Sequence, residues 1–117
     1  EDYCNCQNMQ IYGLNKDGFL RDFAVVPIKN LKHLPENVKT EDAIFVEYIA
    51  TAIKLLDNID LQKGEHVAII GADILGNIIA QLVIYYQAIP IMIDSNENNL
   101  EIAKKSNIYY TVSDEYK

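Results

Sequence analysis

The segment from His66 to Tyr86, HVAIIGADILGNIIAQLVIYY, constrains the fold more than any other part of the chain. It predicts a strand over Val67–Ile70, a glycine turn from Gly71 to Gly76, and a helix to about Tyr86. The strand is continuously apolar, which is typical of parallel strands that are buried on both faces. The helix is apolar nearly all round, so we expect it to be covered on more than one side.

The residues that follow repeat this order of elements. Pro90 opens a second strand, Ile91–Ile93, which ends at Asp94. Ser95 is expected to cap a polar helix through Lys105, and a third strand is predicted over Ile108–Val112. The order β-α-β-α-β predicts an α/β fold containing half of a doubly wound Rossmann parallel sheet.

A short β-rich segment is predicted before these elements, over about the first 40 residues. The sequence NKDG, residues 15–18, indicates a turn in which Gly18 is free to adopt a positive φ. Strands are expected over Phe19–Val26, which Pro27 ends, and over Asn30–Leu34, which Pro35 ends.

A helix is predicted between the β-rich segment and the glycine turn. Thr40 is a suitable cap, and acidic residues follow it at the positive end of the helix dipole. The helix should end near Asp57. Its expected buried face, at spacings of three and four, consists of Val46, Ile49, Ile53 and Leu56.

Composition limits the partners and the compartment. The net charge of −7 and the lack of a Lys/Arg cluster argue against nucleic-acid binding. No apolar run approaches the roughly 20 residues that a membrane span needs. The two cysteines, Cys4 and Cys6, are too closely spaced for an easy disulfide, so we expect free thiols and a cytoplasmic location.

Several segments together resemble one family, the zinc-type medium-chain alcohol and polyol dehydrogenases. DGFLRDFAVVPIKNLKHLPENV is similar to the end of that family's catalytic domain, and EDAIFVEYIATAI resembles the helix that carries a zinc ligand. LQKGEHVAIIGADILGNIIAQL and IPIMIDSNENNLEIAKKSN resemble the beginning of its cofactor domain. The resemblance implies that residues 1–39 are the edge of a GroES-like catalytic domain and that residues 40–117 are a partial NAD-binding Rossmann domain.

The resemblance implies a function as part of a cytoplasmic, NAD-dependent oxidoreductase that acts on a small-molecule alcohol or polyol. Zinc would activate the alcohol in the whole enzyme, and a hydride would pass to NAD. We interpret the chain as an excerpt that is inactive alone. The alternative is a degenerate Rossmann-like module that binds dinucleotides weakly or not at all and acts in assembly. A methyltransferase is a further alternative, which the segments before residue 60 oppose.

The candidate cofactor site is the glycine turn, formed by Gly71, Ala72, Asp73, Ile74, Leu75 and Gly76. The turn has the first and third glycines of a G-x-G-x-x-G pattern, but Asp73 takes the place of the second. A carboxylate at ~4 Å from the cofactor's diphosphate costs about 4 kcal/mol at an effective dielectric of ~20. We hypothesise that Asp73 caps the following helix through the amides of Leu75 or Gly76 and weakens NAD binding.

The second strand supplies the other cofactor residues. Asp94 lies at the strand end where this fold places an acid that binds the adenosine ribose, and Ser95 follows it. Because no Arg follows in SNENN, NAD is preferred over NADP. A helix-capping or solvated acid is the alternative role of Asp94.

The resemblance also assigns residues in the helix before the sheet. It implies that Glu47 is a ligand of catalytic zinc and that Thr51, one turn later, lies near the nicotinamide. A surface Glu and a packing Thr are the alternatives, and Tyr48 departs from the family's Pro. Cys6 resembles one of four structural-zinc cysteines, but we expect no structural zinc. Because half a sheet leaves an apolar face uncovered, we expect a homo-oligomer.

Overall fold

The computed structural model of the protein describes residues 7–113, so Cys4 and Cys6 and the expectations about them lie outside the described residues. The chain divides into two compact units, Glu1–Pro35 and Glu36–Lys117. None of the helices in the described part of the chain is long and apolar enough to cross a membrane.

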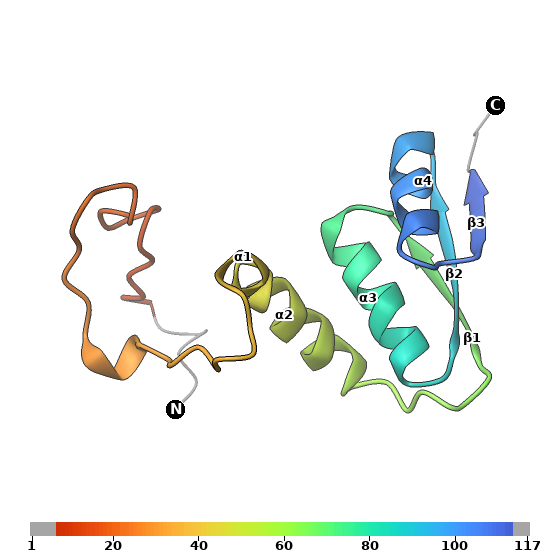
Figure 1. The fold of residues 1–117 in the computed structure, drawn as a ribbon, viewed down its shortest axis with the longest axis horizontal. Helices are drawn as coiled ribbons and strands as arrows, with labels where there is room; N and C mark the ends of the chain where they lie inside the picture. Colours follow the sequence, from red (N-terminus) through yellow and green to blue (C-terminus); the bar gives the residue numbers. More distant parts are fainter. Residues whose placement is uncertain (1–6, 114–117) are drawn as a thin grey trace. The chain divides into compact units, whose positions relative to one another are not determined.

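The second unit contains a three-stranded parallel sheet (Figure 1). Its strands are β1 (His66–Ile70), β2 (Ile89–Asp94) and β3 (Tyr110–Ser113), in the order β1-β2-β3. Ile69 pairs with Met92, and Met92 pairs with Thr111. The predicted β-α-β-α-β order and the α/β fold class are confirmed.

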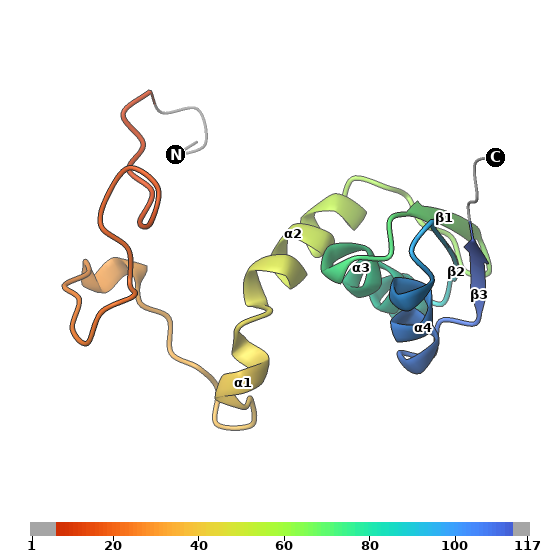
Figure 2. The same ribbon diagram turned by 90° about the horizontal axis from the view of Figure 1, so that it is seen from above.

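Two helices make the crossovers between the strands. Helix α3 (Ile74–Tyr85) connects β1 to β2, and α4 (Glu97–Lys105) connects β2 to β3. Both helices lie on the same face of the sheet, as Figures 1 and 2 show. The core between them and the sheet is built around fully buried Val83, Met92 and Ile108.

The other face of the sheet is open in the described structure, which corrects the expectation that β1 is buried on both faces. Only Ile69 of β1 is buried, and Ile70 is 85% exposed. Because side chains alternate along strands, the paired residues Ile70, Ile93 and Val112 share the open face. Both described crossovers cover the opposite face, so continuous apolar sequence did not indicate two-sided burial here.

The helix expected from Thr40 to Asp57 is divided into α1 (Thr40–Ala43) and α2 (Val46–Leu56). The N-cap of α1 is Lys39, so Thr40 is the first helical residue rather than the cap. The amide of Phe45 donates to the carbonyl of Asp42 (3.2 Å), which is three residues back rather than the four of an α-helix. This tighter turn of the backbone separates the two helices.

The predicted buried face of this helix is only partly correct. Leu56 and Ala52 are buried, whereas Val46, Ile49 and Ile53 are exposed. Helix α2 packs against α3, and the small side chain of Ala52 lies fully buried. The described part of the chain provides nothing to cover the other apolar side chains.

The first unit lacks the two predicted strands. Phe19–Val26 and residues 31–34 form no strand, and Ile28–Asn30 is a short 3-10 helix, η2. The turn lies earlier than predicted, with Gly13 rather than Gly18 at positive φ and its amide bonded to the carbonyl of Lys16 (2.7 Å). Strands need partners for their backbone groups, and the described residues supply none here.

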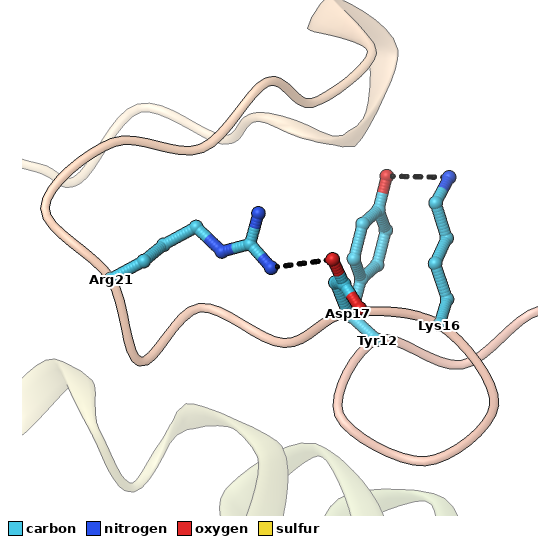
Figure 3. A network of polar contacts seen from close by, with 4 residues as sticks. All are labelled: Tyr12, Lys16, Asp17 and Arg21. Carbon is cyan, nitrogen blue, oxygen red and sulfur yellow. Dashed lines mark hydrogen bonds and ion pairs between the residues drawn. The ribbon is translucent and has the colours of Figure 1, made fainter.

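Side-chain contacts organise this first unit, as Figure 3 shows. Asp17 and Arg21 form an ion pair at 3.0 Å. The Tyr12 ring stacks on Phe19, and the ammonium of Lys16 lies 4.8 Å from the centre of the Tyr12 ring. The four residues drawn in Figure 3 lie close together in the sequence and form two side-chain contacts, Asp17 with Arg21 and Lys16 with Tyr12.

Candidate functional site

The glycine turn lies at the carboxyl end of β1, where β2 also ends. Gly71 has φ +101°, a conformation that side-chain-bearing residues rarely adopt, and its amide donates to the carbonyl of Ile93 (2.8 Å). Gly76 lies in the first turn of α3, where a β-carbon would overlap the carbonyl oxygen of Gly71. The two glycines therefore have the roles predicted for the first and third positions of the pattern: a tight turn and close packing.

Asp73 is the N-cap of α3. Its Oδ1 accepts a hydrogen bond from the amide of Gly76 at 2.9 Å. The predicted capping role is confirmed, with Gly76 rather than Leu75 as the donor. The side chain of Asp73 is exposed, so its charge lies at the helix end that would otherwise attract an anion.

Asp94 connects the end of β2 to the glycine turn. Its Oδ2 accepts from the amide of Ala72 (2.7 Å) and from Nδ2 of Asn99 (3.2 Å). Its Oδ1 accepts from the amide of Asn96 (2.7 Å). These bonds, first that from Asn96 and then that from Ala72, hold the pKa of the Asp94 carboxyl below its ordinary value.

The lowered pKa of Asp94 predicts a contribution to stability that depends on pH. Stability from this carboxylate is fully present above the pKa of the unfolded chain and is lost as pH falls through the lower folded pKa. The difference in the free energy of unfolding between wild type and Asp94→Asn should be constant near neutral pH and shrink below about pH 4. Urea unfolding across this range measures it, with Asp22→Asn, at an exposed acid of the first unit, as control. A stability difference between wild type and Asp94→Asn that grows below pH 4 would contradict the lowered pKa of Asp94 in the folded chain.

The glycine turn and the first turn of α3 contain backbone amides with and without carboxylate partners. The amides of Ala72 and Gly76 are already bonded to carboxylates, whereas those of Ile74 and Leu75, in the first turn of α3, have no partner within the helix. Two amides at a helix N-terminus suit a phosphate, and the carboxylate of Asp73 opposes it. The end of α3 therefore combines two amides that favour an anion with one carboxylate that opposes it.

The structure brings the predicted cofactor residues together, but the capping role predicted for one of them is wrong. Ser95 follows Asp94 but is not the cap of α4; Asn96 is, and its side chain accepts from the amide of Asn98 (3.0 Å). Asn99 was missed in the sequence, where the segment SNENN indicated only the lack of an Arg. Its position five residues after Asp94, in the first turn of a helix, was the available signal.

A cavity of about 580 Å³ lies beside the turn. Its walls are mainly apolar side chains of α2, α3 and α4, among them Ile49, Ile78 and Ile102, and Asn77 also lines it. Asn77 is 8% exposed, and its Oδ1 accepts from Nε2 of Gln81 (2.7 Å). Its Nδ2 is buried and has no hydrogen-bond partner among the described residues.

The orphan amide of Asn77 predicts a stabilising substitution. A buried polar group without a partner costs about 1–3 kcal/mol, and the bond to Gln81 returns about 1 kcal/mol. Asn77→Leu should therefore raise the free energy of unfolding by about 1 kcal/mol, which urea unfolding measures. Gln81→Ala, which removes the bond but leaves the orphan group, should lower it instead. A loss of stability in Asn77→Leu would contradict this prediction.

Glu47 and Thr51 lie one turn apart on α2, and both are exposed. The described residues contain no group of three or more His, Cys, Asp or Glu side chains arranged to hold a metal ion. Phe45, the N-cap of α2, and Ile49 of α2 line the cavity, whereas neither Glu47 nor Thr51 does. The structure thus does not place Glu47 and Thr51 with the cofactor residues, and one carboxylate does not complete a zinc site.

Comparison with known proteins gives consistent matches, although no family model matches the chain. It is 32% identical over 108 residues to an uncharacterised zinc-type alcohol dehydrogenase-like protein of Haemophilus influenzae, covering 92% of the chain and 32% of that protein. It is 32% identical over 101 residues to L-threonine 3-dehydrogenase of Pseudoalteromonas translucida, covering 86% of the chain and 29% of that protein. The chain spans about a third of the length of these curated relatives.

Solved structures agree. An alcohol dehydrogenase of Escherichia coli CFT073 in complex with NADH matches 96% of the chain and 34% of its own, with a TM-score of 0.85 and 26% identity. Galactitol-1-phosphate dehydrogenase of Escherichia coli matches 98% of the chain and 34% of its own, with a TM-score of 0.84 and 26% identity. Over most of its length, the chain is thus similar to zinc-type alcohol and threonine dehydrogenases, in agreement with the resemblance seen in its sequence.

Proposed function

We propose that the chain forms the first half of the NAD-binding domain of a zinc-dependent alcohol or polyol dehydrogenase. The observation that carries this proposal is a hydrogen bond between the carboxyl ends of two neighbouring strands. Asp94, at the end of β2, accepts it from the amide of Ala72, in the turn after β1. This arrangement supports the proposal, because a carboxylate that could accept from a ribose lies beside helix amides that could donate to a diphosphate. The domain division, with a catalytic-domain edge over residues 1–39, is part of the proposal and is supported by the separation after Pro35.

The chain's own residues would bind and orient the dinucleotide, which supplies the hydride-accepting ring. Ile74 and Leu75 would donate their amides to the diphosphate, and Asp94 would accept from ribose hydroxyls, while Ser95 lines the same strand end. The negative charge of Asp94 opposes a 2′-phosphate and supports a preference for NAD over NADP. Partial occupation of the turn by Asp73 should make binding weak rather than absent.

The catalytic part of the proposal rests on the resemblance to the family. Glu47 would be one zinc ligand and Thr51 would lie near the nicotinamide; their spacing by one turn of α2, which puts them on one side of the helix, is consistent with these roles. The remaining zinc ligands and the pocket for a small alcohol or polyol would come from outside the described residues. The chain alone should therefore lack dehydrogenase activity. The relatives above are named as dehydrogenases, so they give no support to the alternative of an assembly module.

The proposal is tested by titrating the chain with NADH and with NADPH and following nucleotide fluorescence. We expect saturable binding of NADH, with NADPH binding at least tenfold weaker. Asp94→Ala should weaken NADH binding and reduce the difference between the two nucleotides. The absence of saturable NADH binding at millimolar concentration would contradict the function.

We further propose that the chain self-associates through the open face of its sheet. Ile70, Tyr110 and Val112 are 85%, 58% and 48% exposed on or beside this face, and large apolar patches rarely stay uncovered. Light scattering at high concentration should give a mass above that of one chain. Ile70→Lys should lower it, whereas Leu55→Lys, at an exposed apolar residue of α2, should not. A single-chain mass in the wild type would contradict the proposal.

A further inference from the structure

The cavity beside the glycine turn has the size and the lining of a site for a small molecule. Its volume of about 580 Å³ lies within the range of ligand pockets, which are mostly apolar and measure about 300–1,000 Å³. Ile49 of α2, Ile78 of α3 and Ile102 of α4 form its apolar walls. Ile49 and Ile102 are 39% and 55% exposed, so the described residues leave this apolar surface open to a ligand.

Asn77 gives the cavity a hydrogen-bond donor that no described residue uses. The side chain lines the cavity but is only 8% exposed, so it belongs to the floor rather than to the rim. Its Oδ1 accepts from Nε2 of Gln81 (2.7 Å), whereas its Nδ2 has no partner among the described residues. The terminal torsion of asparagine is broad, so Nδ2 can turn toward an acceptor in the cavity while the exposed side chain of Gln81 follows Oδ1.

This unpaired donor selects the polar group of the ligand. Nδ2 of Asn77 needs an acceptor, and the carbonyl oxygen of an ester or a tertiary amide accepts without bringing a donor of its own. A hydroxyl group would bring a donor that needs a further partner. A molecule without any polar group would leave Nδ2 unpaired, which is unfavourable for a buried group. The best match is therefore an apolar molecule that carries a carbonyl group.

The charges around the cavity oppose an anionic ligand. The acidic residues Asp42 and Asp73 belong to its lining, and both are exposed. Among the described residues that line the cavity, none is Lys, Arg or His. A carboxylate ligand would accept more strongly from Nδ2 of Asn77, but it would lose its hydration in an apolar cavity and meet two like charges. An uncharged carbonyl compound avoids both effects.

We propose that the cavity between α2, α3 and α4 binds an uncharged acyl compound, in which an apolar chain carries an ester or tertiary amide carbonyl that accepts from Nδ2 of Asn77. The cavity is separate from the positions proposed for zinc and nicotinamide, because neither Glu47 nor Thr51 lines it. The inference therefore goes beyond the proposed dinucleotide function and does not depend on it.

The test titrates the chain, without nucleotide, with N,N-dimethylhexanamide and with octanoate, which has the same number of non-hydrogen atoms. NMR follows the side-chain amide of Asn77. Asn77→Leu removes the donor and is expected to stabilise the chain, so a loss of binding in this variant does not reflect unfolding. Asp42→Asn removes one charge. Asn98→Leu is the matched control, because Asn98 is exposed on α4 and does not line the cavity.

We expect N,N-dimethylhexanamide to bind saturably and to shift the resonance of the Asn77 side chain, and octanoate to bind about tenfold more weakly or less. Asn77→Leu should weaken binding of the amide compound about threefold to tenfold, the effect of one lost hydrogen bond. Asp42→Asn should strengthen octanoate binding and leave binding of the amide compound unchanged. Asn98→Leu should change neither.

Three results would overturn the inference: no saturable binding of N,N-dimethylhexanamide up to about 10 mM, unchanged affinity in Asn77→Leu, or octanoate binding as tightly as the amide compound. Binding that disappears when the chain self-associates would show that a second copy fills the cavity, and would overturn it as well. A failure of the proposed function has a different signature, because the chain would then bind no NADH while these titrations, made without nucleotide, would be unaffected.

Discussion

Replacing Asp73 by glycine is expected to tighten NADH binding by the chain at least about fivefold. The side chain of Asp73 accepts from the amide of Gly76, so its negative charge lies at the end of α3 where we propose that the diphosphate binds. Like charges at ~4 Å repel by about 1 kcal/mol in bulk water and about 4 kcal/mol at an effective dielectric of ~20. Because Asp73 is exposed, the effect should lie between these limits and should decrease as salt is added.

Asp73→Asn separates the charge from the space that the side chain fills. Asparagine is as good an N-cap as aspartate, so α3 should keep its beginning while the charge is removed. We expect Asp73→Asn to recover part of the affinity and Asp73→Gly to recover more. Fluorescence titration at low and high salt measures both. Equal affinity of the wild type and Asp73→Gly for NADH would show that the carboxylate does not obstruct the site.

The sheet unit could be predicted from the sequence because its signals are local and agree with one another. An apolar strand, a glycine turn and an apolar helix follow in order between His66 and Tyr86, and a second strand and helix repeat the unit. Each helix directly connects the two strands that it follows and precedes, so the order of elements along the chain is also their order in the sheet. The structure confirms all three strands and both helices.

The predictions that failed depend on contacts that local sequence does not contain. Alternation over Phe19–Val26 indicates a strand only if neighbouring strands accept its backbone bonds, and the described residues provide none. Burial of Ile70 and of Ile53 likewise depends on a second covering layer. The sequence shows that these residues are apolar, but it does not show which other residues, if any, cover them.

The features of the candidate site also divide into those that local sequence predicts and those that depend on contacts between distant residues. The capping role of Asp73 followed from its place two residues after Gly71, at the start of a helix. The contact between Asp94 and the amide of Ala72 joins residues 22 apart in the chain, and that between Asp94 and Asn99 depends on the direction in which α4 leaves β2. Such contacts need the register of the strands and the geometry of the helix end, which spacing alone does not provide.

Gly76→Ala is expected to destabilise the second unit by about 3 kcal/mol or more, at the upper end of the range for overpacking. Its β-carbon would overlap the carbonyl oxygen of Gly71 and lie 3.1 Å from the carbonyl carbon. Both atoms are backbone, so neither can move without shifting the turn that Asp94 also holds. In an uncrowded helix, the same substitution would stabilise by about 1 kcal/mol, so the sign of the effect is informative.

Gly64→Ala is the matched control, because Gly64 has φ +79° and nothing lies within 4 Å of its would-be β-carbon. Backbone strain alone should cost about 1–2 kcal/mol there. Urea unfolding of both variants should show a clearly larger loss for Gly76→Ala, because close packing of α3 on the turn adds to any backbone effect. A gain in stability, or a loss no larger than that of Gly64→Ala, would mean that α3 does not approach the carbonyl of Gly71 closely. The amides of Ile74 and Leu75 would then not lie where a diphosphate needs them, and the cofactor site would fail with the packing.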